Sequence, residues 1–286
     1  MSNVRKLLEE RIERLTPLAL EKGCTLEYQE KFVNHGLKYG ISICRTDTAP
    51  SLSAVLYYDP DWFQKTDLEV LDILLTYVTD IPEIDLSVLS DREQVLSNVY
   101  PMILDYENLE AIKNTDYYFR DNKLFLILFY TSINMPNGKG TFKITRSLLE
   151  TLHISEEELL GSAFKNAKDT LTIDPISLLL EGILDQISYD SEISTPSFYV
   201  ISNKDKTLGA VNILLPETHR ILSKKLGEKF IILPSSIHEC IAIEYTDDID
   251  DLVNMVTSIN STMVASEEQL NNHVYLCNPK GISLLK

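Results

Sequence analysis

The chain has 286 residues, of which 44% are hydrophobic and 24% are charged, a mixture that is ordinary for a folded globular protein. It carries 26 Lys and Arg against 43 Asp and Glu, a net charge of −17. Binding to a phosphate backbone needs clustered cations. Composition and charge therefore exclude extended disorder and predict no nucleic-acid partner.

Three features of the sequence indicate the cellular compartment of the protein: the start of the chain, its apolar runs and its cysteines. Charged residues interrupt the apolar positions of residues 1–14, which predicts no signal peptide. The longest apolar run, residues 124–130, is far shorter than the roughly 20 residues that span a bilayer, so no membrane partner is predicted. The four cysteines lack metal-ligand spacing. We therefore expect a cytoplasmic protein with reduced thiols, in which Cys24 and Cys44 lie on opposite faces of a hairpin.

The first part of the chain has the pattern of a small subdomain, residues 1–85. Apolar residues recur every three or four positions near the start and then alternate, which predicts a helix followed by strands. The predicted elements are a helix, a hairpin that turns at His35-Gly36, a third strand and a second helix, at residues 4–20, 26–32, 37–43, 54–58 and 62–78. This order also occurs in double-stranded-RNA-binding domains, but the excess of acidic residues argues against that class.

A connection near residue 85 leads to a larger predicted domain, residues 86–286. Residues 124–131 are apolar at both odd and even positions, which predicts a central strand that is buried on both faces. Ser155 and Glu158 form a capping box, and Asp174-Pro175 is expected to open a helix to about residue 187. A loop tip is expected at residues 135–140. Further strands are predicted at residues 117–119, 141–144, 198–202, 209–215, 230–233, 237–245 and 274–277, and further helices at 93–99 (stopped by Pro101), 146–153, 217–226 and 248–259.

Hairpins, rather than strict strand-helix-strand repeats, dominate this pattern. Neighbouring strands in a hairpin run antiparallel. The sequence therefore predicts an α+β fold with mainly antiparallel sheets flanked by helices, in two subdomains at residues 1–85 and 86–286.

The densest cluster of functional side chains is Ser235, Ser236, His238 and Glu239. If Ser236 and His238 lay in one strand, they would be about 6.6 Å apart at roughly 3.3 Å per residue, too far for a direct hydrogen bond. We interpret the cluster as a turn whose hydroxyls satisfy backbone groups. A contact with a ligand or partner and a catalytic role are the alternatives, with Asn203 as one group from a distant segment.

Motifs for cofactor or metal chemistry are absent. The chain has no nucleophile elbow, phosphate loop or dinucleotide fingerprint, and no two histidines are four residues apart. Asp59, Asp61, Asp247 and Asp248 precede predicted helices and are interpreted as caps. The sequence predicts no cofactor and no metal.

Several stretches occur together in a familiar order: 34–37, 55–58, 198–211, 232–239 and 266–275. Together they resemble an uncharacterised family with a domain of unknown function from anaerobic Gram-positive gut bacteria. The resemblance implies no activity, substrate or cofactor. The tail departs from the expected Leu-Ser-Asp-x-Val-Tyr, since Asn271 and Asn272 replace Ser and Asp.

The biochemical function stays unknown at this point. The leading hypothesis is a cytoplasmic, non-enzymatic protein that acts through a protein partner or its own oligomer. The alternative is a small-ligand or hydrolase-like enzyme that uses Ser236 or His238 with groups from distant segments, Asn203 among them.

Overall fold

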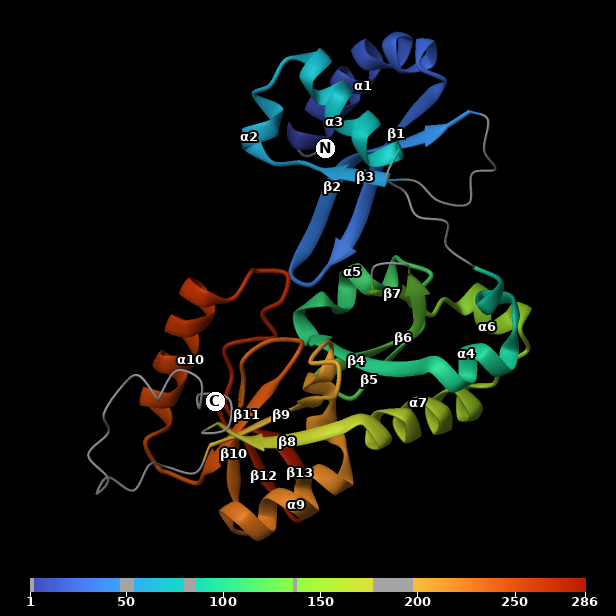
Figure 1. Ribbon diagram of the computed structural model, residues 1–286. Coiled ribbons are helices and arrows are strands. Elements are labelled where there is room, and N and C mark those ends of the chain that lie inside the picture. Colours follow the sequence, from blue (N-terminus) through green and yellow to red (C-terminus); the bar gives the residue numbers. More distant parts are fainter. Residues whose placement is uncertain (1–2, 47–53, 80–85, 136–137, 177–197) are drawn as a thin grey trace. The chain divides into compact units, whose positions relative to one another are not determined.

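A computed structural model describes residues 3–46, 54–79, 86–135, 138–176 and 198–286 (Figure 1). The chain divides into two compact units, residues 1–84 and 85–286. The strand pairs between described residues are antiparallel, which confirms the predicted α+β class. Among the described residues, no helix is both long enough and apolar enough to cross a bilayer.

The first unit is a three-stranded sheet with two main helices. Leu8 and Leu15 of the first helix and Leu74 of the third are fully buried against Ile41 and Ile43 of the sheet. This apolar cluster is what holds the helices on the sheet. The elements of the first unit are α1 (Asn3–Glu21), β1 (Cys24–Val33), β2 (Gly36–Arg45), β3 (Ala54–Tyr57), α2 (Pro60–Phe63) and α3 (Asp67–Thr79).

The β1–β2 hairpin turns one residue earlier than predicted. Val33 pairs with Gly36, so the loop residues are Asn34 and His35, and His35 has a φ of 62°. Two-residue hairpin loops need positive φ values in their central residues. Thr25 pairs with Cys44, which places Cys24 and Cys44 on opposite faces, and all four cysteines are thiols rather than disulfides, as predicted.

The helix predicted at residues 62–78 is wrong, because two helices occupy this region. The Thr66 backbone N–H and hydroxyl donate to the Glu69 carboxylate at 2.8 and 2.7 Å, and the Glu69 N–H donates back to the Thr66 hydroxyl at 3.3 Å. This capping box starts a new helix at α3. Arg11 of α1 donates to the carbonyls of Phe63 and Lys65, and these two hydrogen bonds hold the connection between α2 and α3 against α1.

The second unit begins with a four-stranded sheet in which β6 is central, as predicted. β4, which contains Pro101, was missed because proline has no N–H for a sheet ladder; β4 pairs only with β6 and is an edge strand, where proline is tolerated. The elements are η1 (Ser87–Ser90), α4 (Arg92–Asn98), β4 (Val99–Asp105), η2 (Tyr106–Asn108), α5 (Leu109–Lys113), β5 (Phe119–Asp121), β6 (Phe125–Met135), β7 (Gly138–Lys143), α6 (Arg146–Thr151) and α7 (Glu156–Thr170).

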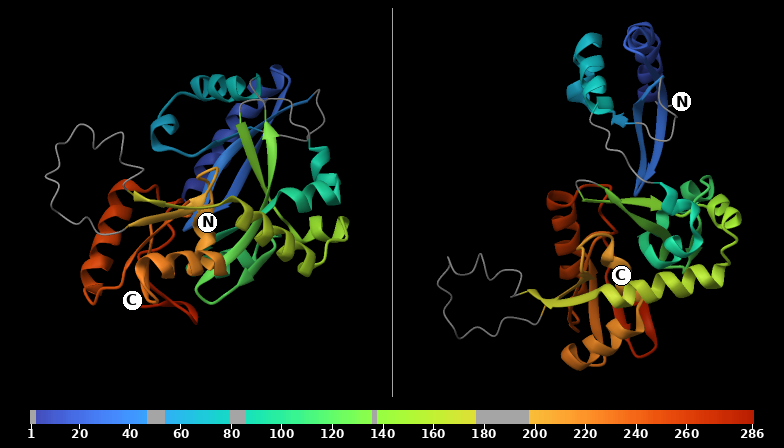
Figure 2. Two further views of the ribbon diagram at one scale, coloured as in Figure 1. Left: turned by 60° about the horizontal axis from the view of Figure 1, so that its bottom comes forward. Right: turned by 45° about the vertical axis from the view of Figure 1, so that its right-hand side comes forward.

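The rest of the second unit is a six-stranded sheet in the order β13-β12-β10-β11-β9-β8. Figure 2 shows α7 running directly into its edge strand. The elements are β8 (Leu171–Pro175), β9 (Tyr199–Asn203), η3 (Gly209–Leu214), α9 (Pro216–Leu226), β10 (Phe230–Pro234), β11 (Cys240–Glu244), α10 (Ile249–Met263), β12 (Tyr275–Asn278) and β13 (Gly281–Leu284). The last strand, β13, was not predicted.

The two long helices of this part lie on opposite faces of the six-stranded sheet. The Phe230 ring contacts His219 of α9, whereas its neighbour Ile231 belongs to the cluster under α10. Successive residues of a strand point to opposite faces. Tyr275, which pairs with Ile232, shares the face of Phe230 and contacts Phe125 of β6. The four-stranded sheet therefore packs on the α9 side.

Two further predictions about this sheet need correction. Asp174 and Pro175 end β8, where Asp174 pairs with Val200, and the helical assignment begins only at Ile176; the remainder of that predicted helix lies outside the described residues. Gly209–Leu214 is a 3-10 helix instead of a strand. There, the buried Asn212 amide donates to the Ser202 carbonyl at 2.7 Å, a tertiary bond that local alternation cannot reveal.

Candidate functional site

The five predicted site residues lie around one loop junction. Pro234 pairs with Cys240, so residues 235–239 form the loop between β10 and β11 rather than the start of a strand. Asn203 ends the neighbouring strand β9. The structure therefore brings Asn203, Ser236 and His238 to the same region, where the loop meets the segment between β9 and η3.

The His238 imidazole is part of this junction. Its Nδ1 accepts a hydrogen bond from the Leu208 backbone N–H at 3.0 Å, and its Nε2 lies 3.5 Å from Glu268 Oε1. Because Nδ1 is an acceptor, the neutral ring carries its proton on Nε2, a tautomer assigned from the bonding pattern. Both ring nitrogens are then occupied, and the neutral ring has no lone pair left to act as a general base.

The side chains of Ser236 and Asn203 both bind backbone atoms. The buried Ser236 hydroxyl accepts the His238 backbone N–H at 3.0 Å. Asn203 donates from Nδ2 to the Thr207 carbonyl at 2.7 Å and accepts the Thr207 N–H at 3.2 Å. In these two loops, side chains bind backbone groups that would form sheet hydrogen bonds if the strands continued.

The backbone at Gly209 explains how closely the two loops approach. A Cβ atom at this position would lie 2.7 Å from the Asn203 nitrogen and 2.7 Å from Ser202 Oγ. Gly209 N–H and Ser202 Oγ both donate to the His238 carbonyl, at 3.0 and 2.9 Å. Only glycine fits here.

Ser235 and Glu239 are half-buried at the ends of the loop. The Glu239 carbonyl accepts the Ser236 N–H at 3.1 Å. Burial, and to a smaller extent the Glu239 charge, raise the pKa of the adjacent Cys240 thiol, which makes it a poor nucleophile. The bonds of Asn203, Ser236 and His238 thus connect the loop between β10 and β11 with the segment between β9 and η3.

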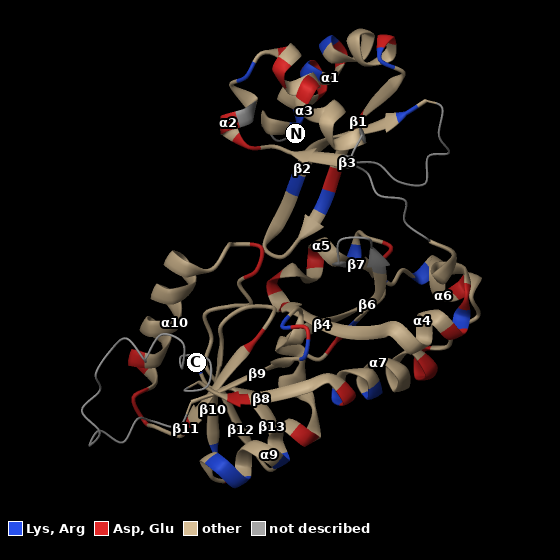
Figure 3. Ribbon diagram, viewed as in Figure 1, with Lys and Arg blue, Asp and Glu red and all other residues tan. Residues whose placement is uncertain are grey.

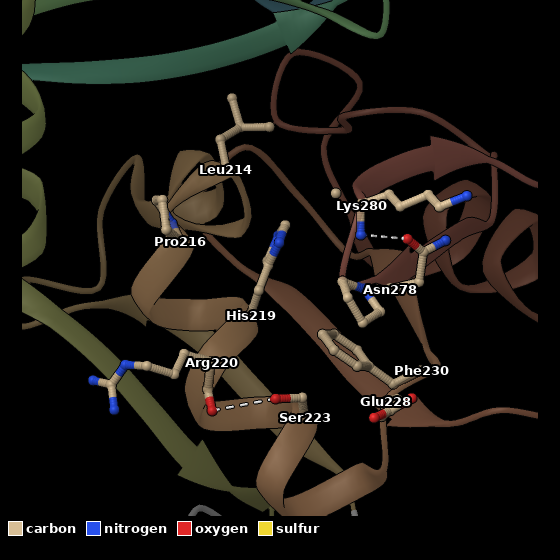
Figure 4. A pocket seen from close by; sticks show the side chains of 11 residues that line it. Leu214, Pro216, His219, Arg220, Ser223, Glu228, Phe230, Asn278 and Lys280 are labelled. Carbon is tan, nitrogen blue, oxygen red and sulfur yellow. Dashed lines mark hydrogen bonds between the residues drawn. The ribbon is translucent and has the colours of Figure 1, made fainter.

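A pocket of about 450 Å³ lies elsewhere in the second unit, between α9 and the β12–β13 turn (Figure 4). Phe230 lines it together with His219 and Asn278, while Arg220 and Lys280 extend to opposite sides. None of the five predicted residues lines it. The helical spacing of residues 216, 219, 220 and 223 was a signal in the sequence, but the opposite wall is some sixty residues further along the chain.

His219 of this pocket lies near Cys277, a pairing that the sequence did not predict. His219 Nε2 is 3.8 Å from Cys277 Sγ, but it is also 2.7 Å from the Ile213 carbonyl. A carbonyl only accepts, so Nε2 carries the proton and cannot remove one from the thiol. Burial raises the pKa of Cys277 to about 12. The pair does not form an activated cysteine.

The acidic residues that were interpreted as caps behave differently at the two helices. Asp59 accepts the Asp61 N–H at 2.7 Å, in keeping with a cap at α2. At α10, Asp248 occupies the N-cap position without a side-chain cap bond, and Asp247 accepts the Tyr245 hydroxyl instead. Asp248 therefore lies at a predicted cap position, but its carboxylate accepts the Thr246 hydroxyl at 3.4 Å instead of a helix N–H.

α10 carries an unusual exposed surface. Met255, Ile259 and Met263 follow each other at four-residue steps and are 43%, 42% and 80% exposed. We name these three residues the Met-Ile-Met row. From residue 252 to residue 265 the chain has no charged residue, and in Figure 3 α10 is uncharged beyond its first turn.

The fold and the site define an α+β protein with antiparallel sheets, in which the side chains of Asn203, Ser236 and His238 form hydrogen bonds with backbone groups. A family model described as "Family of unknown function (DUF5688)" matches residues 2–278. The chain belongs to this family. Membership in a family of unknown function is thereby confirmed, while the origin in gut bacteria stays a prediction. No curated protein and no solved structure matches the chain.

Proposed function

We propose that this protein is a non-enzymatic interaction protein and that its contact surface is the Met-Ile-Met row of α10. The observation that carries this proposal is the exposure of Met255, Ile259 and Met263 on a helix segment without charge. Exposed apolar surface of this kind is costly in water and is typical of surfaces that a partner covers.

The state of the reactive side chains supports a role without catalysis. The His238 ring uses both nitrogens, Ser236 binds a backbone N–H, and Cys277 has a raised pKa. A nucleophile needs a base with a lone pair within hydrogen-bond reach. These groups do not supply one in their present arrangement.

We also propose that the protein works in a bacterial cytoplasm. Cys24, Cys240 and Cys277 are buried thiols and Cys44 is half-buried, which suits a reducing compartment. The bacterial origin rests on the sequence resemblance described above.

The experiment is site-specific photo-crosslinking in the native cell. p-Benzoylphenylalanine replaces Met263 in one full-length variant and Lys6 of α1, a similarly exposed residue, in the matched control. We expect a protein adduct from position 263 and none from position 6. Absence of an adduct at 263, equal adducts at both positions, or a crosslink only to another segment of the same molecule would contradict the proposal.

A further inference from the structure

The Met-Ile-Met row is not needed for the core of its own chain. The inner side of α10 is formed by Ile249, Leu252, Val253 and Val256, which pack on the six-stranded sheet. Asn260, also on this side, donates to the Asn271 carbonyl at 3.0 Å. Four-residue steps place the row beside this buried side, as one of the ridges through which helices pack against each other.

The charge of the protein restricts what can cover this ridge. Two copies of a chain with net charge −17 repel each other, so a stable contact between them needs a surface that carries no charge of its own. Residues 252–265 are such a surface. A strongly basic partner would find no carboxylate here to pair with, and burying its cations unpaired would be unfavourable.

The row is also symmetric about its central residue. Met255 precedes Ile259 by four residues and Met263 follows it by four. When two such helices run antiparallel with Ile259 at the crossing point, Ile259 meets its own copy and each Met255 meets Met263 of the other chain. A two-fold contact requires this kind of self-complementary surface.

The acids in the first turn select the antiparallel orientation. Asp250 and Asp251 lie at the amino end of α10, and Asp250 also pairs with Lys286. In a parallel pair these acids would meet the same acids of the second chain. In an antiparallel pair centred on Ile259 the first-turn acids lie beyond the carboxyl end of the other helix, which stops at Met263, so they do not meet the same acids, and the two helix dipoles are also opposed.

We propose that the partner of the Met-Ile-Met row is a second copy of this chain, bound as an antiparallel α10–α10 pair with its two-fold axis at Ile259. This inference rests on the proposed function, because it names the occupant of the same surface. It predicts a homodimer in which the side chains at the two-fold axis all come from the two α10 helices.

The first test is the oligomeric state of the full chain by sedimentation equilibrium at several salt concentrations. We expect a dimer whose dissociation constant falls as salt screens the negative charges. Ile259→Lys and Met263→Lys should each raise the dissociation constant at least tenfold. Leu68→Lys, the same kind of change at an exposed apolar residue of α3, is the control and should leave it unchanged. A monomeric wild type, or an unchanged dimer in both α10 variants, overturns the proposal.

The second test maps the register with engineered cysteines in a Cys44→Ser background, which removes the one thiol that is not buried. Ile259→Cys alone should form an intermolecular disulfide under mild oxidation. Met255→Cys and Met263→Cys should crosslink efficiently only when the two variants are mixed. Equal self-crosslinking of Met255→Cys would indicate a parallel pair and overturn the proposed geometry.

The two proposals fail in distinguishable ways. If position 263 crosslinks to a different protein in the cell and the purified chain is a monomer, the interaction function stands and the second copy is wrong. If position 263 yields no intermolecular adduct and the chain is a monomer, both are wrong. A dimer that survives every α10 substitution overturns the second copy as the occupant of the row, and the interaction function then stands only if position 263 crosslinks to a different protein.

Discussion

Helices α1 and α10 carry exposed rows of the same spacing but opposite chemistry. In α1, residues Lys6, Glu10 and Arg14 follow at four-residue steps; Lys6 pairs with Glu10 at 3.7 Å, and Arg14 binds Asp67 at 2.7 Å. In α10, the equivalent spacing presents Met255, Ile259 and Met263. Both helices bury another side against a sheet.

This difference separates an ordinary solvent face from a contact surface. Charged rows keep a helix hydrated and contribute only small ion-pair energies. An apolar row of the same exposure has no such role in a monomer. Helical periodicity identifies the buried side of both α1 and α10. The chemistry of the exposed row indicates whether a partner covers it.

The largest loss of stability is expected from a substitution on the buried side of a helix, a side that α1 and α10 both have. Leu15→Ala in α1 removes a fully buried side chain and should lower the free energy of unfolding by about 2–5 kcal/mol. Leu20→Ala, on the same helix but 54% exposed, is the control and should stay within about 0.5 kcal/mol. Urea denaturation measures both. Similar losses in the two variants would mean that α1 does not pack as described.

Next comes the cap that divides the predicted helix at residues 62–78. Thr66→Ala removes the capping-box hydroxyl of α3 and should cost about 1 kcal/mol. Thr76→Ala makes the same chemical change inside α3 and serves as the control. Differential scanning calorimetry should show a lower midpoint only for Thr66→Ala. An equal response of both variants would argue against the cap.

The ion pair of the charged row should contribute less and depend on pH. The Arg14 guanidinium holds the pKa of Asp67 below its usual value, so the pair stabilises the fold above the ordinary aspartate pKa of about 3.9 and loses this contribution as the pH falls through the lower folded value. Arg14→Met should cost less than about 1 kcal/mol at neutral pH. NMR titration of Asp67 should then show a higher pKa. An unchanged pKa would contradict the pairing.

The smallest effect on folding is expected from exchanging the two rows. Met263→Lys and Lys6→Met should each change the free energy of unfolding by no more than about 0.5 kcal/mol when measured at low protein concentration, where association contributes least. Only Met263→Lys should weaken association. A loss above about 1 kcal/mol in Met263→Lys would place this residue in the core and remove the contrast between α1 and α10.

Features that depend on residues close together in the chain could be predicted from the sequence, whereas several that depend on distant residues could not. The helix at residues 4–20 and the capping box of Ser155 and Glu158 depend on residues within a few positions of each other, and both are present. The capping box at Thr66 was equally local but was overlooked inside a continuous apolar pattern. The strand with Pro101 was missed because only its place at the sheet edge makes proline acceptable.

The candidate site shows the same limit. The residues at 235–239 were interpreted as a turn with bound hydroxyls, and Ser236 does bind a backbone N–H. The partners that occupy His238, Leu208 and Glu268, lie about thirty residues away on either side, and no local pattern links them. The pocket at His219 likewise joins two distant segments.

By itself the sequence determined the charge, the amphipathic helices, the hairpins and the absence of a recognisable catalytic motif, because each of these depends on composition or on short-range spacing. Tertiary structure decided that Asp174 and Pro175 belong to a strand, which nitrogen of His238 carries the proton, and which apolar residues of α10 stay exposed. The physical reason is that exposure and hydrogen-bond partners depend on what packs against a residue, and packing brings together segments that are far apart in the chain.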